Sequence, residues 1–169
     1  ARFATRDYDE VKPPTGGDRV YTLADLPQPE GPELVVWAEQ GIGDVIQFSR
    51  YLLLLQAREV RFQFLVFNHQ SLFTLCRDWL GLGHSVSTHL PPSREHDQRP
   101  NIPLMSLPHL FGTDLHTVPA ITPYMTAPEQ APEHLHILEP PGGLAVGLVW
   151  ATNPLNKSMY RQKTCPLEL

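Results

Sequence analysis

The amino-acid sequence predicts an α/β domain built on a parallel sheet with helices on both faces. Segments typical of strands and of helices alternate along the chain, which favours parallel strands joined by helical crossovers. The run Leu34-Val35-Val36-Trp37 is apolar at every position, as expected of a central strand buried on both faces. A glycine turn and an amphipathic helical pattern follow it directly. This order of elements predicts a Rossmann-like sheet.

The length and composition indicate one globular domain. The chain has 169 residues, of which 41% are apolar and 18% charged, so it can bury a substantial core. Its net charge of -5 argues against a general nucleic-acid binder, because such proteins usually carry a basic surface. The apolar runs are too short for a membrane span, and neither of the two cysteines has CxxC or metal-ligand spacing. We therefore expect a protein of the reducing cytoplasm.

The domain proper is expected at 33–169, after an entry segment. Residues 1–32 are mostly polar and rich in proline and glycine, so we expect a linker with at most a short strand near 19–23. The first strand of the domain is predicted at 33–39. The first helix is predicted over 44–58, because apolar residues recur there at three- and four-residue intervals.

The rest of the chain continues the alternation of strands and helices. Further strands are expected at 60–67, 85–89, 102–105 and 144–150. Further helices are expected at 70–80, 106–111 and 128–139. Gly81 and Gly83 are expected to close the helix 70–80. The proline-rich or polar segments 90–100 and 113–124 are predicted to be irregular.

The turn after the first strand, Gln40-Gly41-Ile-Gly43-Asp44, is the first candidate site. Glycines let a turn tighten and let a ligand approach the backbone closely. Ligands of open α/β sheets bind outside the carboxyl ends of the strands, which is where this turn is expected. Asp44 is therefore a candidate general base held at that crevice. The alternative is an N-cap, whose side-chain oxygen accepts a hydrogen bond from the helix backbone.

The same turn departs from the known nucleotide-binding motifs. The dinucleotide fingerprint needs a third glycine where Ile46 stands, and an acid where the second strand ends in Phe67-Asn68. A Gly-Lys-Ser/Thr phosphate loop is absent as well. A nucleotide-binding α/β domain that uses the glycine turn thus remains an alternative with two departures against it.

A basic loop near the C-terminus is the second candidate site. Lys157, Arg161 and Lys163 lie close together after the strand expected at 144–150, in an otherwise acidic protein. With Asn153 and Ser158 they could hold a diphosphate and offset its charge as it leaves. The alternative is a solvated basic tail. The eight histidines have no metal-ligand spacing, so we expect no metal and no cofactor.

At these motifs the sequence resembles a known family. The block Trp37–Leu52 looks like part of the glycosyltransferase-like domain that follows tetratricopeptide repeats in bacteria. The segments 103–113, 121–124 and 146–154 resemble further blocks of that family, in the same order. The resemblance extends over residues 33–168, and residues 1–7 resemble the junction after the repeats.

That family is similar in turn to heptosyltransferases of the two-domain GT-B architecture. The resemblance implies that the N-terminal domain holds an acceptor glycan or protein and that the C-terminal domain holds a nucleotide-sugar. It also implies inverting transfer without a catalytic metal, with Asp44 as the base and with Lys157 and Arg161 near the donor phosphates. The loop around these two cations departs from the family's commoner form, which is rich in His, Asn, Asp and Arg.

By this resemblance the chain corresponds to the N-terminal half of such an enzyme. It begins without methionine and stops where a donor-binding domain is expected, so we expect the intact parent to be a transferase and this piece to be inactive alone. A non-catalytic glycan- or protein-binding module of a repeat protein is the main alternative, and a spacer is the simplest one. A homodimer through the face left open for the second domain is a further hypothesis.

Overall fold

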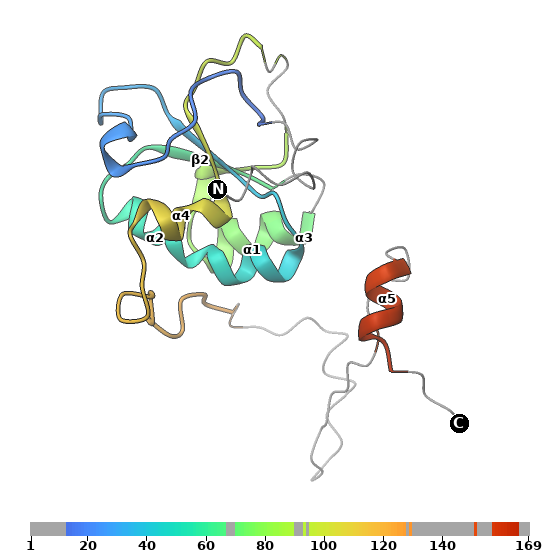
Figure 1. Ribbon diagram of the computed structural model, residues 1–169. Helices are drawn as coiled ribbons and strands as arrows, with labels where there is room; N and C mark the ends of the chain where they lie inside the picture. The colour runs from blue at the N-terminus through green and yellow to red at the C-terminus, as the bar shows by residue number, and fades with distance from the viewer. Residues whose placement is uncertain are drawn as a thin grey trace. The chain divides into compact units, whose positions relative to one another are not determined.

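The computed structural model describes residues 13–66, 70–89, 93, 95–127, 129, 151 and 157–165. The chain divides into two compact units, Ala1–Ala127 and Pro128–Leu169. The first unit contains a sheet with its helices, and the second contains the helix α5 (Lys157–Lys163) (Figure 1). None of the described helices has the length and apolar character needed to cross a membrane.

Four parallel strands form the sheet of the first unit. They are β1 (Leu34–Trp37), β2 (Phe62–Leu65), β3 (Val86–Ser87) and β4 (Asn101–Pro103). Their spatial order is β3-β2-β1-β4, so the chain steps outward from β1 to β3 and then returns to the other side of β1. Val36 pairs with Phe64 on one side and with Ile102 on the other, which makes β1 a central strand. The prediction of an α/β domain with a parallel, Rossmann-like sheet is confirmed.

The helix predicted over 44–58 is divided in two. It consists of α1 (Ile42–Phe48) and α2 (Arg50–Gln56), which meet at Ser49. The hydroxyl of buried Ser49 donates a hydrogen bond to the Ile46 carbonyl at 2.9 Å, and the Leu52 amide donates to the Ser49 carbonyl at 2.9 Å. A serine that bonds back to the preceding turn tends to bend a helix, and the three-residue bond tightens it locally. The prediction of one uninterrupted helix was wrong at this residue.

The later elements are shorter than the sequence predicts. The helix predicted over 70–80 is α3 (Gln70–Thr74), continued by the π-helical segment η4 (Leu75–Trp79). Gly81 and Gly83 end it with φ of 76° and 55°, a left-handed conformation that favours glycine, as predicted. The segment 102–111 becomes β4, the 3-10 turn η6 (Leu104–Ser106) and α4 (Leu107–Leu110).

The strand predicted near 19–23 is replaced by a turn, and two later predicted elements lie mostly outside the described residues. Near 19–23, where a short strand was predicted, Arg19 makes an isolated bridge to Asn101 and the 3-10 turn η3 (Leu23–Asp25) follows. Asp25 accepts hydrogen bonds from the Thr22 amide and hydroxyl, which favours a turn over an extended strand. The helix predicted at 128–139 and the strand predicted at 144–150 lie outside the described residues, apart from residue 129.

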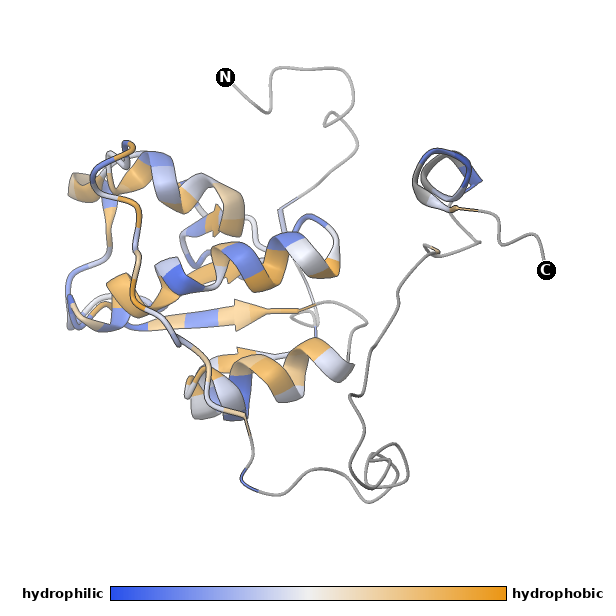
Figure 2. Ribbon diagram, turned by 90° about the horizontal axis from the view of Figure 1, so that it is seen from below, coloured by the Kyte–Doolittle hydropathy of each residue, from blue (hydrophilic) through white to orange (hydrophobic). Residues whose placement is uncertain are grey.

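The buried helical side chains of the first unit gather on one face of the sheet. Val45, Leu52, Leu72 and Leu107 join the cluster that contains the sheet residue Phe64. The opposite face carries a separate cluster: Val35, Trp37 and Leu65. Figure 2 shows the helices of the first unit together in front of largely hydrophobic strands. Within the described residues, the helices therefore cover one face of the sheet, whereas the sequence predicts helices on both faces. The difference arises because the apolar stripes of these helices all pack into the same cluster.

The segment 113–127, called the strap here, crosses these helices without regular secondary structure, as predicted for 113–124. The Pro119 carbonyl accepts a hydrogen bond from Arg50 Nη1 in α2 at 2.7 Å. The Thr126 amide donates to the Trp79 carbonyl in η4 at 2.8 Å. The strap is thus anchored to two helical segments that are far from it in sequence.

Candidate functional site

The carboxyl ends of β1 and β4 lie side by side where the strand order reverses. Trp37, the last residue of β1, pairs with Pro103, the last residue of β4. In open α/β sheets the crevice outside these ends, at the reversal of strand order, is where ligands bind. The turn 38–41 and η6 lie at this edge of the sheet, because each directly follows one of the strands.

Glu39 connects the turn 38–41 to η6. Its Oε1 accepts a hydrogen bond from the Met105 amide of η6 at 3.2 Å, and both residues are half-buried. Glu39 is not among the site residues predicted from the sequence. The sequence signal for Glu39 is its place just past the end of a buried strand. A carboxylate at that place can contact the loop that follows the neighbouring strand.

Gly41 begins the helix that carries Asp44. Gly41 has an extended backbone, with φ of -65° and ψ of 168°, and its carbonyl accepts the first helical hydrogen bond from the Val45 amide at 3.1 Å. Gly41 is therefore the N-cap, and Asp44 is the third residue of α1. The N-cap alternative for Asp44 was wrong, because α1 begins two residues before it.

The glycines of this turn leave the backbone uncovered. Neither Gly41 nor Gly43 has the left-handed conformation that favours glycine, so the turn does not require them for its geometry. A Cβ added at Gly43 would meet no atom within 4 Å, and one at Gly41 would lie 3.7 Å from Asp44 Oδ2. Gly43 thus borders open space in the first turn of α1, which a ligand could enter. Gln40, half-buried, precedes these glycines.

The Asp44 carboxylate is available for chemistry. The side chain is half-exposed and makes no hydrogen bond or ion pair with another described residue. The Oδ2 position near Gly41 places the carboxylate beside the start of the helix. A carboxylate held in this way can accept a proton from a hydroxyl that enters the crevice.

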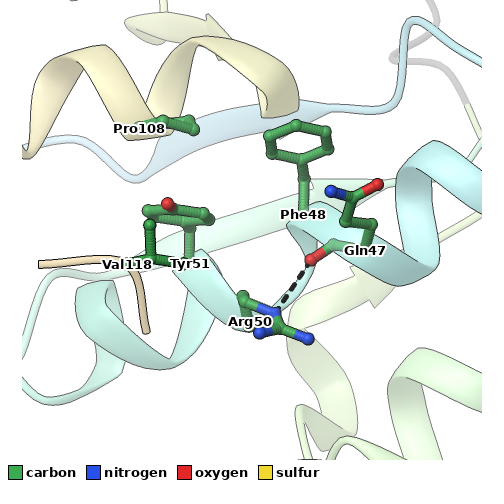
Figure 3. A pocket seen from close by; sticks show the side chains of 6 residues that line it. All are labelled: Gln47, Phe48, Arg50, Tyr51, Pro108 and Val118. Carbon is green, nitrogen blue, oxygen red and sulfur yellow. Dashed lines mark hydrogen bonds between the residues drawn. The ribbon is translucent and has the colours of Figure 1, made fainter. Parts of the chain in front are cut away.

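A groove of about 270 Å³ lies further along the same helices. Its lining residues are Gln47, Phe48, Arg50, Tyr51, Pro108 and Val118 (Figure 3). The rings of Phe48 and Tyr51 are stacked, with centroids 6.2 Å apart and an angle of 23° between their planes. Pro108 of α4 lies across the groove from these rings in Figure 3. The sequence analysis assigned Phe48 to the buried face of a helix, so the groove was not predicted.

The second candidate site belongs to the second unit and forms a helix. Lys157 and Arg161 are both exposed on α5. Four residues apart on a helix, they share one face. The prediction of a loop was wrong here, because Lys, Met, Arg and Gln have good intrinsic helix propensity. Ser158 is the second residue of α5, and Asn153 lies outside the described residues.

Within the described part of the chain, no three His, Cys, Asp or Glu side chains are arranged to hold a metal ion. Comparisons of this chain with protein-family models, with curated proteins and with solved structures found no match. The case for function therefore rests on the residues at the carboxyl edge of the sheet, on α5 and on the motifs in the sequence.

Proposed function

We propose that this chain is the N-terminal, acceptor-side domain of a GT-B glycosyltransferase-like protein. The intact protein transfers a sugar from a nucleotide-sugar to a hydroxyl of a glycan or protein acceptor, without a catalytic metal. The observation that carries the proposal is the place of Asp44, in the first turn of α1 just beyond the carboxyl end of β1. This is the edge of the sheet where the strand order reverses.

In the proposed reaction the acceptor hydroxyl gives its proton to the Asp44 carboxylate. Its oxygen then bonds to the anomeric carbon while the bond from that carbon to the diphosphate breaks. The negative charge leaves on the nucleoside diphosphate, and Lys157 and Arg161 stabilise it. Their exposure on one face of α5 supports this role, since both guanidinium and ammonium groups are open to a ligand.

The sequence motifs support the wider context of the proposal. The block Trp37–Leu52 contains both Glu39 and Asp44, and its resemblance to repeat-associated bacterial domains suggests tetratricopeptide repeats before it in the intact protein. Such a protein would work in the cytoplasm, where nucleotide-sugars are available.

The test measures sugar transfer by the intact gene product. Nucleotide-sugars with different bases and sugars are offered with short glycans and with protein acceptors, and released nucleoside diphosphate is quantified. We expect Asp44→Asn to lower kcat by about 10²- to 10⁴-fold, the usual contribution of general base catalysis. Asp18→Asn is the matched control, because Asp18 is exposed beside the bridge at the amino end of β4. Full activity of Asp44→Asn would contradict the assigned role.

A second candidate, a non-catalytic glycan-binding module, is favoured by one observation. The groove lined by Phe48 and Tyr51 has stacked aromatic rings, which suit glycan binding whether or not transfer occurs. Glycan binding by the intact protein without transfer from any nucleotide-sugar would support this second candidate.

A further inference from the structure

Asp44 and three of the residues that line the groove lie along one side of the helices. Gln47, Phe48 and Tyr51 follow Asp44 by three, four and seven residues, the spacings that share a helical face. Ser49, where α1 and α2 meet, keeps right-handed helical dihedrals of -59° and -22°, so the stripe is carried across the junction. A ligand that reaches Asp44 at one end can therefore extend into the groove at the other.

Resting on the proposed function, we propose that this groove is an acceptor subsite that holds one neutral pyranose ring of a glycan. A pyranose has apolar C–H faces and a rim of hydroxyl groups, so its site needs flat apolar walls and a few unused polar groups. The groove offers both. The half-buried ring of Phe48 forms the apolar wall on α1, the buried Tyr51 ring of α2 is stacked against it, and Pro108 lies across from them (Figure 3).

The unused polar groups are the Tyr51 hydroxyl and the Gln47 amide. Tyr51 is only 4% exposed, yet among the described residues its hydroxyl has no hydrogen-bond partner. The Tyr51 hydroxyl is not one of the buried polar atoms without a partner, so it reaches the surface of the groove. A ligand hydroxyl would there replace water as its hydrogen-bond partner. The exposed Gln47 side chain likewise makes no hydrogen bond to a described residue, so it can donate and accept at the rim.

The contacts of Arg50 favour a neutral ligand in the groove over an anion. Among the described residues that line the groove, Arg50 is the one ionised side chain, and its guanidinium already has partners. It donates to the Pro119 carbonyl at 2.7 Å and to the Gln47 carbonyl at 3.1 Å, and lies 4.4 Å from the centre of the Tyr124 ring. The volume of about 270 Å³ is just below the roughly 300–1,000 Å³ of sites for drug-sized ligands, which fits a single ring.

The experiment titrates the full chain with methyl pyranosides of glucose, galactose, mannose and N-acetylglucosamine, and with maltotriose. Binding is followed by saturation-transfer NMR and by amide shifts of 44–51. We expect at least one probe to bind below about 10 mM. Tyr51→Phe removes only the hydroxyl, and Phe48→Leu removes only the aromatic ring. Each should weaken binding by about 3- to 10-fold. Tyr21→Phe is the control, since Tyr21 is exposed outside the groove.

Three results would overturn the subsite. The first is that none of the sugar probes binds. The second is that Tyr51→Phe binds the sugars as tightly as the unchanged protein does. The third is that a proline-rich peptide, and none of the sugars, changes the amide chemical shifts of the groove residues. The outcome is separable from that of the proposed function. Asp44-dependent transfer with an unchanged KM in Tyr51→Phe would refute the subsite alone. Tyr51-dependent binding without transfer by the intact protein would refute the transferase alone.

Discussion

The Tyr124 hydroxyl donates a hydrogen bond of 2.8 Å to the carbonyl oxygen of Ile46, 78 residues earlier in the chain. The same carbonyl accepts the Ser49 hydroxyl at 2.9 Å, so two side chains use its two lone pairs. The junction between α1 and α2 thus provides the acceptor that fastens the strap. Because Val118 of the strap lines the groove, this bond also helps to shape the groove.

Removing the Tyr124 hydroxyl should loosen the strap. Tyr124→Phe keeps the ring beneath Arg50 but loses the bond to Ile46. We expect the free energy of unfolding to fall by about 0.5–1.5 kcal/mol, the usual contribution of one hydrogen bond. Urea denaturation measures this, and amide exchange at 113–127 should be faster. With Tyr21→Phe as the reference, equal stability and exchange in both variants would show that the bond does not hold the strap.

Adding a methyl group at Gly43 should raise the stability of the domain and lower the activity of the intact protein. Gly43→Ala places a methyl group in open space within α1, so the helix should gain up to about 1 kcal/mol from the better helix former. The intact protein should nevertheless lose activity, since the methyl group occupies space at the proposed site. Melting temperature and kcat/KM measure the two effects, and unchanged kcat/KM would argue against ligand approach here.

Gly17→Ala should lower the stability of the domain, in contrast to Gly43→Ala. A Cβ at Gly17 would overlap the Arg99 carbonyl oxygen, so the backbone must shift. We expect a loss of about 1–3 kcal/mol of stability, the range for overpacking. Thermal unfolding of the two alanine variants side by side provides the comparison, and equal melting temperatures would contradict it.

The two cysteines should differ in reactivity. Burial raises the pKa of the Cys76 thiol to about 12, whereas Cys165 is exposed. The thiolate is the reactive form, so Cys76 should be inert near pH 8 in the folded protein. An aromatic disulfide reagent should then titrate one thiol in the native protein and two in denaturant. Two thiols in the native protein would contradict the burial of Cys76.

Lowering the pH should reduce the contribution of Asp97 to the stability of the fold. Hydrogen bonds from the Arg99 side chain hold the pKa of the Asp97 carboxyl below its ordinary value of 3.8. A carboxyl whose pKa is lower in the folded than in the unfolded state stabilises the fold when the pH is above the unfolded-state pKa. That stabilisation is lost as the pH falls through the folded-state pKa. Asp97→Asn should therefore cost about 1–2 kcal/mol at pH 7 and less at pH 3.

The exposed Asp78–Arg77 pair is the control for this prediction. Its side chains are 44% and 45% exposed, so Asp78→Asn should change the urea midpoint little at either pH. If Asp97→Asn were no more harmful than Asp78→Asn at pH 7, the ion pair with Arg99 would not be stabilising.

The local elements of the first unit could be predicted because their signals are local. The apolar run of β1, the helical spacing after Asp44 and the closing glycines Gly81 and Gly83 each depend on neighbours within a few residues. Asp44 could be selected for the same reason, since strand, turn and helix follow one another directly. The break at Ser49 could not, because the apolar pattern runs unchanged across it.

The sequence by itself determined the class of the fold, the position of the central strand and the placing of Asp44 after that strand. Only the tertiary structure decided the strand order, the contact of Glu39 with Met105 and the groove between Tyr51 and Pro108. These features join segments tens of residues apart, and they depend on which strand pairs with β1. Local periodicity specifies which face of an element is buried, but the partner of that face is set by packing in three dimensions.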